Sequence, residues 1–154
     1  MVAVLILASC HEVDDDRIPF APVHIPFATQ AQWEIYGVTG ALQHRRFILD
    51  KGEPSGFPYN VQCYTGFGGV LLCSDVYGNP VAYDLACPVE RNKNTLIIVD
   101  NDAANAYCPV CHSVYDVFSN FGIPLSGEAA QHGYGLRRYS VTAGINGGYR
   151  MVRN

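Results

Sequence analysis

The chain has 154 residues, of which 49% are hydrophobic and 16% charged, and its formal net charge is −4. This length suits one domain, and the composition excludes a disordered tail, a coiled coil and a nucleic-acid binder built on a basic face. The 15 Gly, 9 Pro and 10 Tyr favour a turn-rich β domain. Six cysteines are the unusual feature of the composition.

The first nine residues form an apolar run that ends in small residues and is followed by Cys10. The run is too short to span a membrane as a helix, and it matches the apolar core and cleavage site of a secretory signal. Residues 7–10, Leu-Ala-Ser-Cys, resemble the lipobox of bacterial lipoproteins. The resemblance implies that residues 1–9 are removed and that Cys10 carries the lipid. No Lys or Arg precedes the run, which departs from that pattern, and the alternative is a buried first strand.

An acidic segment follows Cys10, and residues 10–17 are predicted to be a flexible tether. The lipoprotein resemblance then implies a chain anchored by its lipid to a bacterial envelope membrane, facing the periplasm or the cell surface. Such a compartment is oxidising, so disulfides are permitted there. The folded domain is expected to span residues 18–154.

Residues 18–27 contain three prolines, so they are predicted to be an edge strand or an extended arm. In the next segment, Trp33, Ile35 and Tyr36 would begin a strand and residues 47–49 would end another. Residues 51–59 carry prolines and glycines and predict a loop.

The clearest strands are short apolar runs separated by turn residues. An Asn-Gly pair within residues 144–148 predicts the turn of the last hairpin. No window of about 12 residues shows helical periodicity. We therefore expect an all-β, antiparallel fold. The predicted strands are residues 61–64, 70–75, 81–86, 95–100, 114–118, 136–142 and 149–152.

Two cysteine-containing turns carry the only constellation with evident chemistry. Cys87-Pro-Val-Glu90 closes one predicted strand, and Cys108-Pro-Val-Cys111 follows residues 91–107. Paired turns of this kind supply the ligands of a tetrahedral zinc site, and the spacing fits a zinc ribbon. Glu90 stands where the fourth cysteine would be, and a carboxylate is also a zinc ligand.

The second turn begins a longer motif that resembles a known family. The run Cys-Pro-Val-Cys-His-Ser-Val-Tyr-Asp at 108–116 is followed by Gly-Ile-Pro at 122–124, Gly-Glu-Ala at 127–129 and Leu-Arg-Arg-Tyr-Ser-Val at 136–141. In this order these elements resemble the second half of a Rieske domain, and the resemblance covers about residues 60–142. It implies an antiparallel β-sandwich or barrel with a metal-loop region at about 85–126.

Rieske loops supply Cys-x-His and Cys-x-x-His to a [2Fe–2S] cluster, and the resemblance carries this pattern over only in part. Cys87 and Cys108 match the two cysteine positions. Val89 stands at the histidine position of the first loop, Cys111 stands at that of the second, and His112 comes one residue late. The donors present are Cys87, Cys108 and Cys111, together with Glu90 or His112.

Three hypotheses follow for this constellation. The first is an iron–sulfur electron-transfer module with altered ligands, and the second is a structural zinc site. The third is a metal-free domain with a Cys87–Cys108 or Cys108–Cys111 disulfide. The chain is thus expected to be a metal-binding lipoprotein module without enzymatic activity, or a redox-inert Rieske fold that binds a partner or a surface.

Other polar and sulfur-containing residues are expected to serve the fold. Cys63 and Cys73 lie on neighbouring predicted strands, where they are either a disulfide or two buried thiols. Asp84 and Asp116 follow strand aromatics and are expected to accept hydrogen bonds from loop amides.

Overall fold

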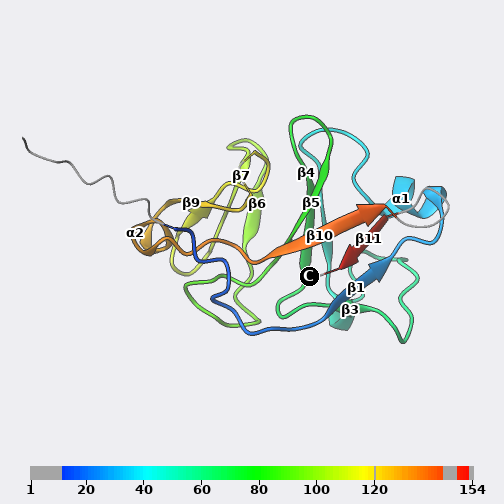
Figure 1. Ribbon diagram of the computed structural model, residues 1–154, viewed down its shortest axis with the longest axis horizontal. Helices are drawn as coiled ribbons and strands as arrows, with labels where there is room; N and C mark the ends of the chain where they lie inside the picture. The colour runs from blue at the N-terminus through cyan, green and yellow to red at the C-terminus, as the bar shows by residue number, and fades with distance from the viewer. Residues whose placement is uncertain (1–11, 120, 144–148, 153–154) are drawn as a thin grey trace, which may run out of the picture.

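The computed structural model describes residues 12–119, 121–143 and 149–152 (Figure 1). Its strands form two antiparallel sheets, which confirms the all-β expectation. The large sheet has the order β2-β4-β5-β10-β11-β1-β3, and the small sheet has the order β6-β7-β8-β9. The strands are β1 (Val23–Pro26), β2 (His44–Phe47), β3 (Tyr64–Thr65), β4 (Val70–Ser74), β5 (Pro80–Asp84), β6 (Ile98–Asp100), β7 (Asn105–Tyr107), β8 (Val114–Tyr115), β9 (Pro124–Ser126), β10 (Arg138–Ala143) and β11 (Tyr149–Val152), and the helices are α1 (Gln30–Tyr36), η1 (Leu49–Lys51) and α2 (Glu128–His132).

Helices α1 and α2 lie at opposite ends of the molecule, α1 near the large sheet and α2 near the small one (Figure 1). Within the described ranges, no helix has the length and apolar character needed to cross a membrane.

Strand β4 separates two hydrophobic cores. All five of its residues are buried, and alternate side chains of a strand point to opposite faces. Val70 and Leu72 therefore face one core, whereas Leu71 and Cys73 face the other. We call the first the aromatic core; its buried residues are Val23, Ile25, Phe27, Trp33, Val38, Phe47, Phe57, Val70, Leu72, Ala82 and Tyr139. We call the second the cysteine-side core; its buried residues are Ile48, Leu71, Cys73, Tyr83, Leu85, Cys87, Ile97, Ala106, Cys108, Tyr115, Val117, Phe118, Ala129 and Leu136.

Helix α1 corrects the strand predicted to begin at Trp33, Ile35 and Tyr36. The side chain of Thr29 caps the helix by accepting a hydrogen bond from the Gln32 backbone N–H at 3.2 Å. The helix has seven residues, so its periodicity is lost in a window of about 12 residues. Trp33 is buried against the Phe27 ring, whose centroid lies 5.0 Å away, so packing stabilises this short helix.

Strand β1 corrects the prediction of an edge strand or extended arm at 18–27. It pairs with β11 on one side and with β3 on the other. The central residues His24 and Ile25 lie between the prolines, so their N–H groups remain available to the sheet. The edge is instead β3, whose predicted extent of 61–64 was also wrong, because residues 61 and 62 form a turn in which Val61 is 94% exposed.

The remaining predicted strands are present, with shifted ends. Strands β4, β5, β10 and β11 confirm the runs at 70–75, 81–86, 136–142 and 149–152, whereas the runs at 95–100 and 114–118 shorten to β6 and β8. Strands β7 and β9 and helix α2 were not predicted, because each has only three to five residues. The predicted turn at 144–148 lies outside the described residues.

Cys10 and the rest of residues 1–11 also lie outside the described residues. Downstream of them, the Asp14 backbone N–H donates to the Gly133 carbonyl at 2.8 Å, and the Asp14 carbonyl accepts from the Gly135 N–H at 2.9 Å. The Asp15 carboxylate pairs with Arg138 at 3.1 Å. The acidic segment predicted as a tether therefore contacts the body of the domain at Asp14 and Asp15.

Candidate metal centre

Strand β5 leads into the first cysteine turn, and the buried Asp84 carboxylate fixes the end of this strand. Its Oδ1 accepts hydrogen bonds from the backbone N–H groups of Gly68 at 2.9 Å and Ala86 at 2.8 Å. Its Oδ2 accepts from the Phe67 N–H at 2.8 Å and from the Tyr139 hydroxyl at 2.7 Å. These bonds confirm the expectation that Asp84 binds loop amides, and they tie the start of the turn to the large sheet.

The turns at 87–91 and 108–112 have the same backbone design. In the first, the Arg91 N–H donates to the Cys87 carbonyl at 2.9 Å; in the second, the His112 N–H donates to the Cys108 carbonyl at 3.0 Å. Arg91 has φ +52° and His112 has φ +57°, so both turns end in the left-handed region. We call them the first knuckle (87–91) and the second knuckle (108–112).

Backbone N–H groups in each knuckle point at the sulfur of its leading cysteine. In the first knuckle, Val89 and Glu90 donate to Cys87 Sγ. In the second, Val110 donates to Cys108 Sγ at 3.5 Å. Hydrogen bonds to a sulfur favour its charged thiolate form, which is the form that binds metals. Both turns are therefore prepared to present a thiolate.

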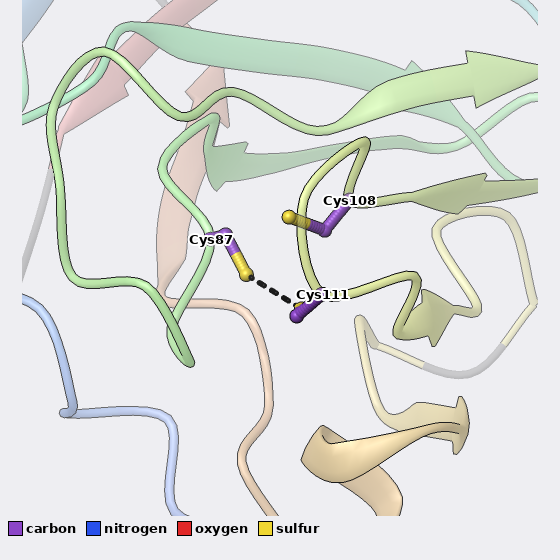
Figure 2. A group of neighbouring side chains, drawn as sticks. All are labelled: Cys87, Cys108 and Cys111. Atoms are coloured by element: carbon purple, nitrogen blue, oxygen red, sulfur yellow. Dashed lines mark hydrogen bonds between the residues drawn. The ribbon is translucent and has the colours of Figure 1, made fainter.

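The two knuckles bring three cysteine sulfurs together. The Sγ atoms of Cys87, Cys108 and Cys111 all lie within 4.8 Å of one another, and those of Cys87 and Cys111 are 3.6 Å apart (Figure 2). A disulfide would require about 2.05 Å. A tetrahedral ion with metal–sulfur bonds of about 2.3 Å separates its sulfur ligands by about 3.8 Å. The three sulfurs thus have the spacing of ligands around one ion, and all three cysteines are free.

Burial sets the protonation of these thiols. It raises the pKa of Cys87 to about 12, and it also raises the pKa of Cys108. Burial raises the pKa of Cys111 too, but hydrogen bonds, foremost those with Ser113, outweigh it and leave this pKa below its usual value. At neutral pH the metal-free site therefore holds protons on Cys87 and Cys108, and a metal ion must displace them.

Two buried hydroxyl groups contact the sulfurs. Ser113 Oγ lies 3.3 Å from Cys111 Sγ and accepts a hydrogen bond from the Ala129 N–H at 3.0 Å, whereas the Tyr115 hydroxyl lies 3.5 Å from Cys87 Sγ. Because Ser113 Oγ already accepts from Ala129, its own proton is free to bond a Cys111 thiolate. Sequence reasoning did not assign these roles, although both residues lie in the motif that resembles a Rieske domain.

The other two candidate ligands lie outside the three-sulfur group. Glu90 is half-buried in the first knuckle, and His112 is exposed at the end of the second. Among the described residues, only the three cysteines form a group with metal-ligand spacing. The Val89 side chain packs against the cysteine-side core and offers no donor atom.

Cys63 and Cys73 are free buried thiols, so the structure holds no disulfide between them. Cys73 faces the cysteine-side core from β4, and Cys63 Sγ accepts a hydrogen bond from the Asn60 N–H at 3.4 Å. The alternative of two buried apolar thiols agrees with this arrangement. The Cys87–Cys108 and Cys108–Cys111 disulfides are likewise not formed.

No protein-family model, curated protein or solved structure matches this chain. What supports a function is thus the geometry of the chain itself. The described residues contain a group of three cysteines that could hold a metal ion, carried by matched turns that follow β5 and β7.

Proposed function

We propose that this chain is a metal-binding module that holds one zinc-type ion through Cys87, Cys108 and Cys111. The observation that carries the proposal is the mutual spacing of the three sulfurs, all within 4.8 Å. Thiolate ligands in tetrahedral geometry select zinc or iron–sulfur centres over hard cations such as magnesium and calcium. The matched knuckles support the proposal, because turns that direct N–H groups at sulfur stabilise bound thiolates.

The donor set does not fit a Rieske cluster. Such a cluster needs two cysteines on one iron and two histidines on the other. Here Val89 has a hydrocarbon side chain at the first histidine position, and a thiol stands at the second. The three sulfurs also lie within 4.8 Å of one another, which is close enough for all three to bind one ion. We therefore propose a Rieske-like β scaffold whose site has changed from a redox cluster to a redox-inert ion.

Metal analysis of protein purified without oxygen tests this function. We expect a colourless protein with one zinc ion per chain. Two irons per chain, acid-labile sulfide and visible absorption bands would instead establish an iron–sulfur electron carrier. Cys63→Ala is the matched control, because it removes a buried thiol outside the site and should leave the metal content unchanged.

We also propose that the module is anchored to a bacterial envelope membrane through a lipid on Cys10. The support is the Leu-Ala-Ser-Cys sequence at 7–10 after an apolar run. In a bacterial host, the wild-type chain should sediment with membranes and carry the mass of a lipid. Cys10→Ser should release it into the soluble fraction, and equal membrane association of both chains would contradict the anchor.

A further inference from the structure

The three cysteines of the candidate site differ in their exposure to solvent. Cys87 and Cys108 have no exposed surface, whereas Cys111 is partly exposed in the second knuckle. Its chain neighbour Val110 is 56% exposed, so this end of the knuckle lies at the surface. Cysteines that react with small oxidants are typically exposed in this partial way. Of the three, Cys111 is therefore the residue that a dissolved oxidant meets first.

Cys87 lies on the other knuckle with its sulfur close to that of Cys111. The two Sγ atoms are 3.6 Å apart, and Figure 2 shows the contact between them. A disulfide has an S–S distance of about 2.05 Å, so the sulfurs would need to approach by about 1.5 Å. Rotation of one side chain between its staggered positions moves a sulfur by more than this. The pair is thus placed to form a bond when two electrons are removed from it.

The other two pairings are less favourable. Cys87 and Cys108 are both fully buried, so an oxidant meets neither of them first. Cys108 and Cys111 are three residues apart in one turn, and a bond that closes so short a loop restricts the unfolded chain least. Cys87 and Cys111 are 24 residues apart and belong to different turns. Their bond would hold the two knuckles together, as the ion does.

We propose that Cys87 and Cys111 are an oxidation site, at which hydrogen peroxide forms a disulfide between them and releases the bound ion. This inference rests on the proposed metal-binding function and adds its regulation. The disulfide uses two of the three sulfur ligands, and Cys108 alone cannot retain the ion. Zinc does not change its oxidation state, so both electrons come from the two sulfurs.

The oxidation consists of two substitutions. The Cys111 sulfur attacks one peroxide oxygen, the O–O bond breaks, and the other oxygen leaves as water with a proton from solvent. The Cys87 sulfur then attacks the sulfur of the resulting Cys111 sulfenic acid, whose hydroxyl leaves as a second water with another solvent proton. Two thiolates, one peroxide and two protons thus give one disulfide, two waters and a free zinc ion. A dithiol reduces the bond again by thiol–disulfide exchange.

Treatment of the zinc-loaded full chain with excess hydrogen peroxide tests the site. Compared with the untreated chain, a chromogenic chelator should record the release of one zinc ion per chain. Mass mapping after alkylation of the remaining thiols should identify a peptide linked through Cys87 and Cys111, with Cys108 alkylated. Dithiothreitol and zinc should restore the loaded protein. Cys63→Ala is the matched control and should release zinc to the same extent, because this thiol is buried outside the site.

Two variants, treated without metal, separate the two steps. Cys108→Ala keeps both members of the pair, so peroxide should still link Cys87 to Cys111. Cys87→Ala removes the thiol that completes the disulfide, so the reaction should stop at the sulfenic acid. Dimedone, which traps sulfenic acids, should then label Cys111.

A Cys108–Cys111 or Cys87–Cys108 bridge in the peroxide-treated wild type would overturn the inference. A zinc-loaded chain that keeps its ion and all three thiols in excess peroxide would overturn it as well. A wild-type chain that binds no zinc would instead refute the proposed function, and mapping of its peroxide-treated thiols would still test the pairing.

Discussion

The two sheets of this domain differ in the length of their strands and in the side chains that pack against them. The large sheet contains strands of up to six residues and packs its aromatic rings around Phe27, Phe47 and Phe57. The small sheet has strands of two or three residues, and it packs on the cysteine-side core, which includes two of the proposed metal ligands and side chains from β4 and β5. Hydrophobic packing therefore builds both cores, and what sets the cysteine-side core apart is that it contains side chains that the proposed metal would join.

The buried cysteines show why this dependence is expected. Cys87 and Cys108 are fully buried, and each is bonded through its backbone to its own knuckle. Without an ion, these cysteines stabilise the fold only as small apolar side chains. With an ion they cross-link two loops that are 21 residues apart in the chain, as their numbering shows. Metal binding then becomes folding free energy for the small sheet.

Among the substitutions that separate the two sheets, Cys108→Ala should have the largest effect on stability. Removal of one of three ligands should abolish metal binding, and with it most of the binding free energy, which is about 10 kcal/mol or more for structural zinc. Hydrogen exchange should become faster in β6 to β9 and stay unchanged in β1, whose buried side chains lie in the aromatic core. Cys63→Ala is the control, and equal loss of protection in both sheets would contradict a local role for the ion.

Phe47→Ala should produce the opposite pattern. Phe47 is fully buried, and its ring centroid lies 5.2 Å from that of Phe57, so truncation should cost about 3–5 kcal/mol of unfolding free energy. Chemical denaturation measures the loss. The cobalt spectrum of the folded variant should match that of the wild type, since the aromatic core lies on the other face of β4. An altered spectrum would show that the two cores are coupled.

Asp84→Asn should affect both sheets together, because this carboxylate joins β5 to the first knuckle. An amide cannot accept all four of the hydrogen bonds that Asp84 accepts, so we expect a loss of about 1–3 kcal/mol. Denaturation monitored by tyrosine fluorescence and by cobalt absorption should give coincident transitions at a lower midpoint. Asp50→Asn, at an exposed position, is the control and should leave the midpoint unchanged.

The pH dependence of stability provides a second check on Asp84. Burial raises the pKa of its carboxyl group in the folded state. A raised folded-state pKa means that this contribution to stability is full below the unfolded value, about 3.9, and is lost as the pH rises through the folded-state pKa. Asp84→Asn should remove that decline, and an unchanged pH profile would argue against the shift.

The smallest expected effect comes from the two hydroxyl groups beside the sulfurs. Ser113→Ala and Tyr115→Phe each remove one hydrogen-bond partner of a ligand, which should weaken metal binding by about tenfold. Competition with a chromogenic zinc chelator measures the change. Tyr83→Phe, which removes another buried hydroxyl from the same core, is the control, and unchanged affinity in both test variants would exclude a tuning role.

The sequence predicted the long strands and the cysteine turns, because both carry strong local signals. Alternating or continuous apolar residues mark β4, β5 and β10, and Cys-Pro-Val marks each knuckle. Helix α1 was missed because Trp33 packs against Phe27, a contact that no local pattern encodes. Strands β7 and β9 were missed because only pairing with neighbouring strands defines segments of three residues.

The candidate site was predicted only in part, for a related reason. The spacing of Cys87, Cys108 and Cys111 identified the donors, but Glu90 and Cys111 occupy equivalent positions that sequence alone treats alike. Only the fold distinguishes them, because it brings the Cys111 sulfur to 3.6 Å from Cys87 and leaves Glu90 outside the group. The hydroxyl contacts of Ser113 and Tyr115 likewise depend on the packing of β8 and α2.

X-ray absorption at the zinc edge of the metal-loaded chain tests the central claim most directly. Measured in thiol-free buffer, the zinc should show three sulfur neighbours at about 2.3 Å and one lighter atom. Fewer than three sulfur neighbours would contradict the account. A natively purified protein that contains two neighbouring iron atoms and no zinc would also contradict the account.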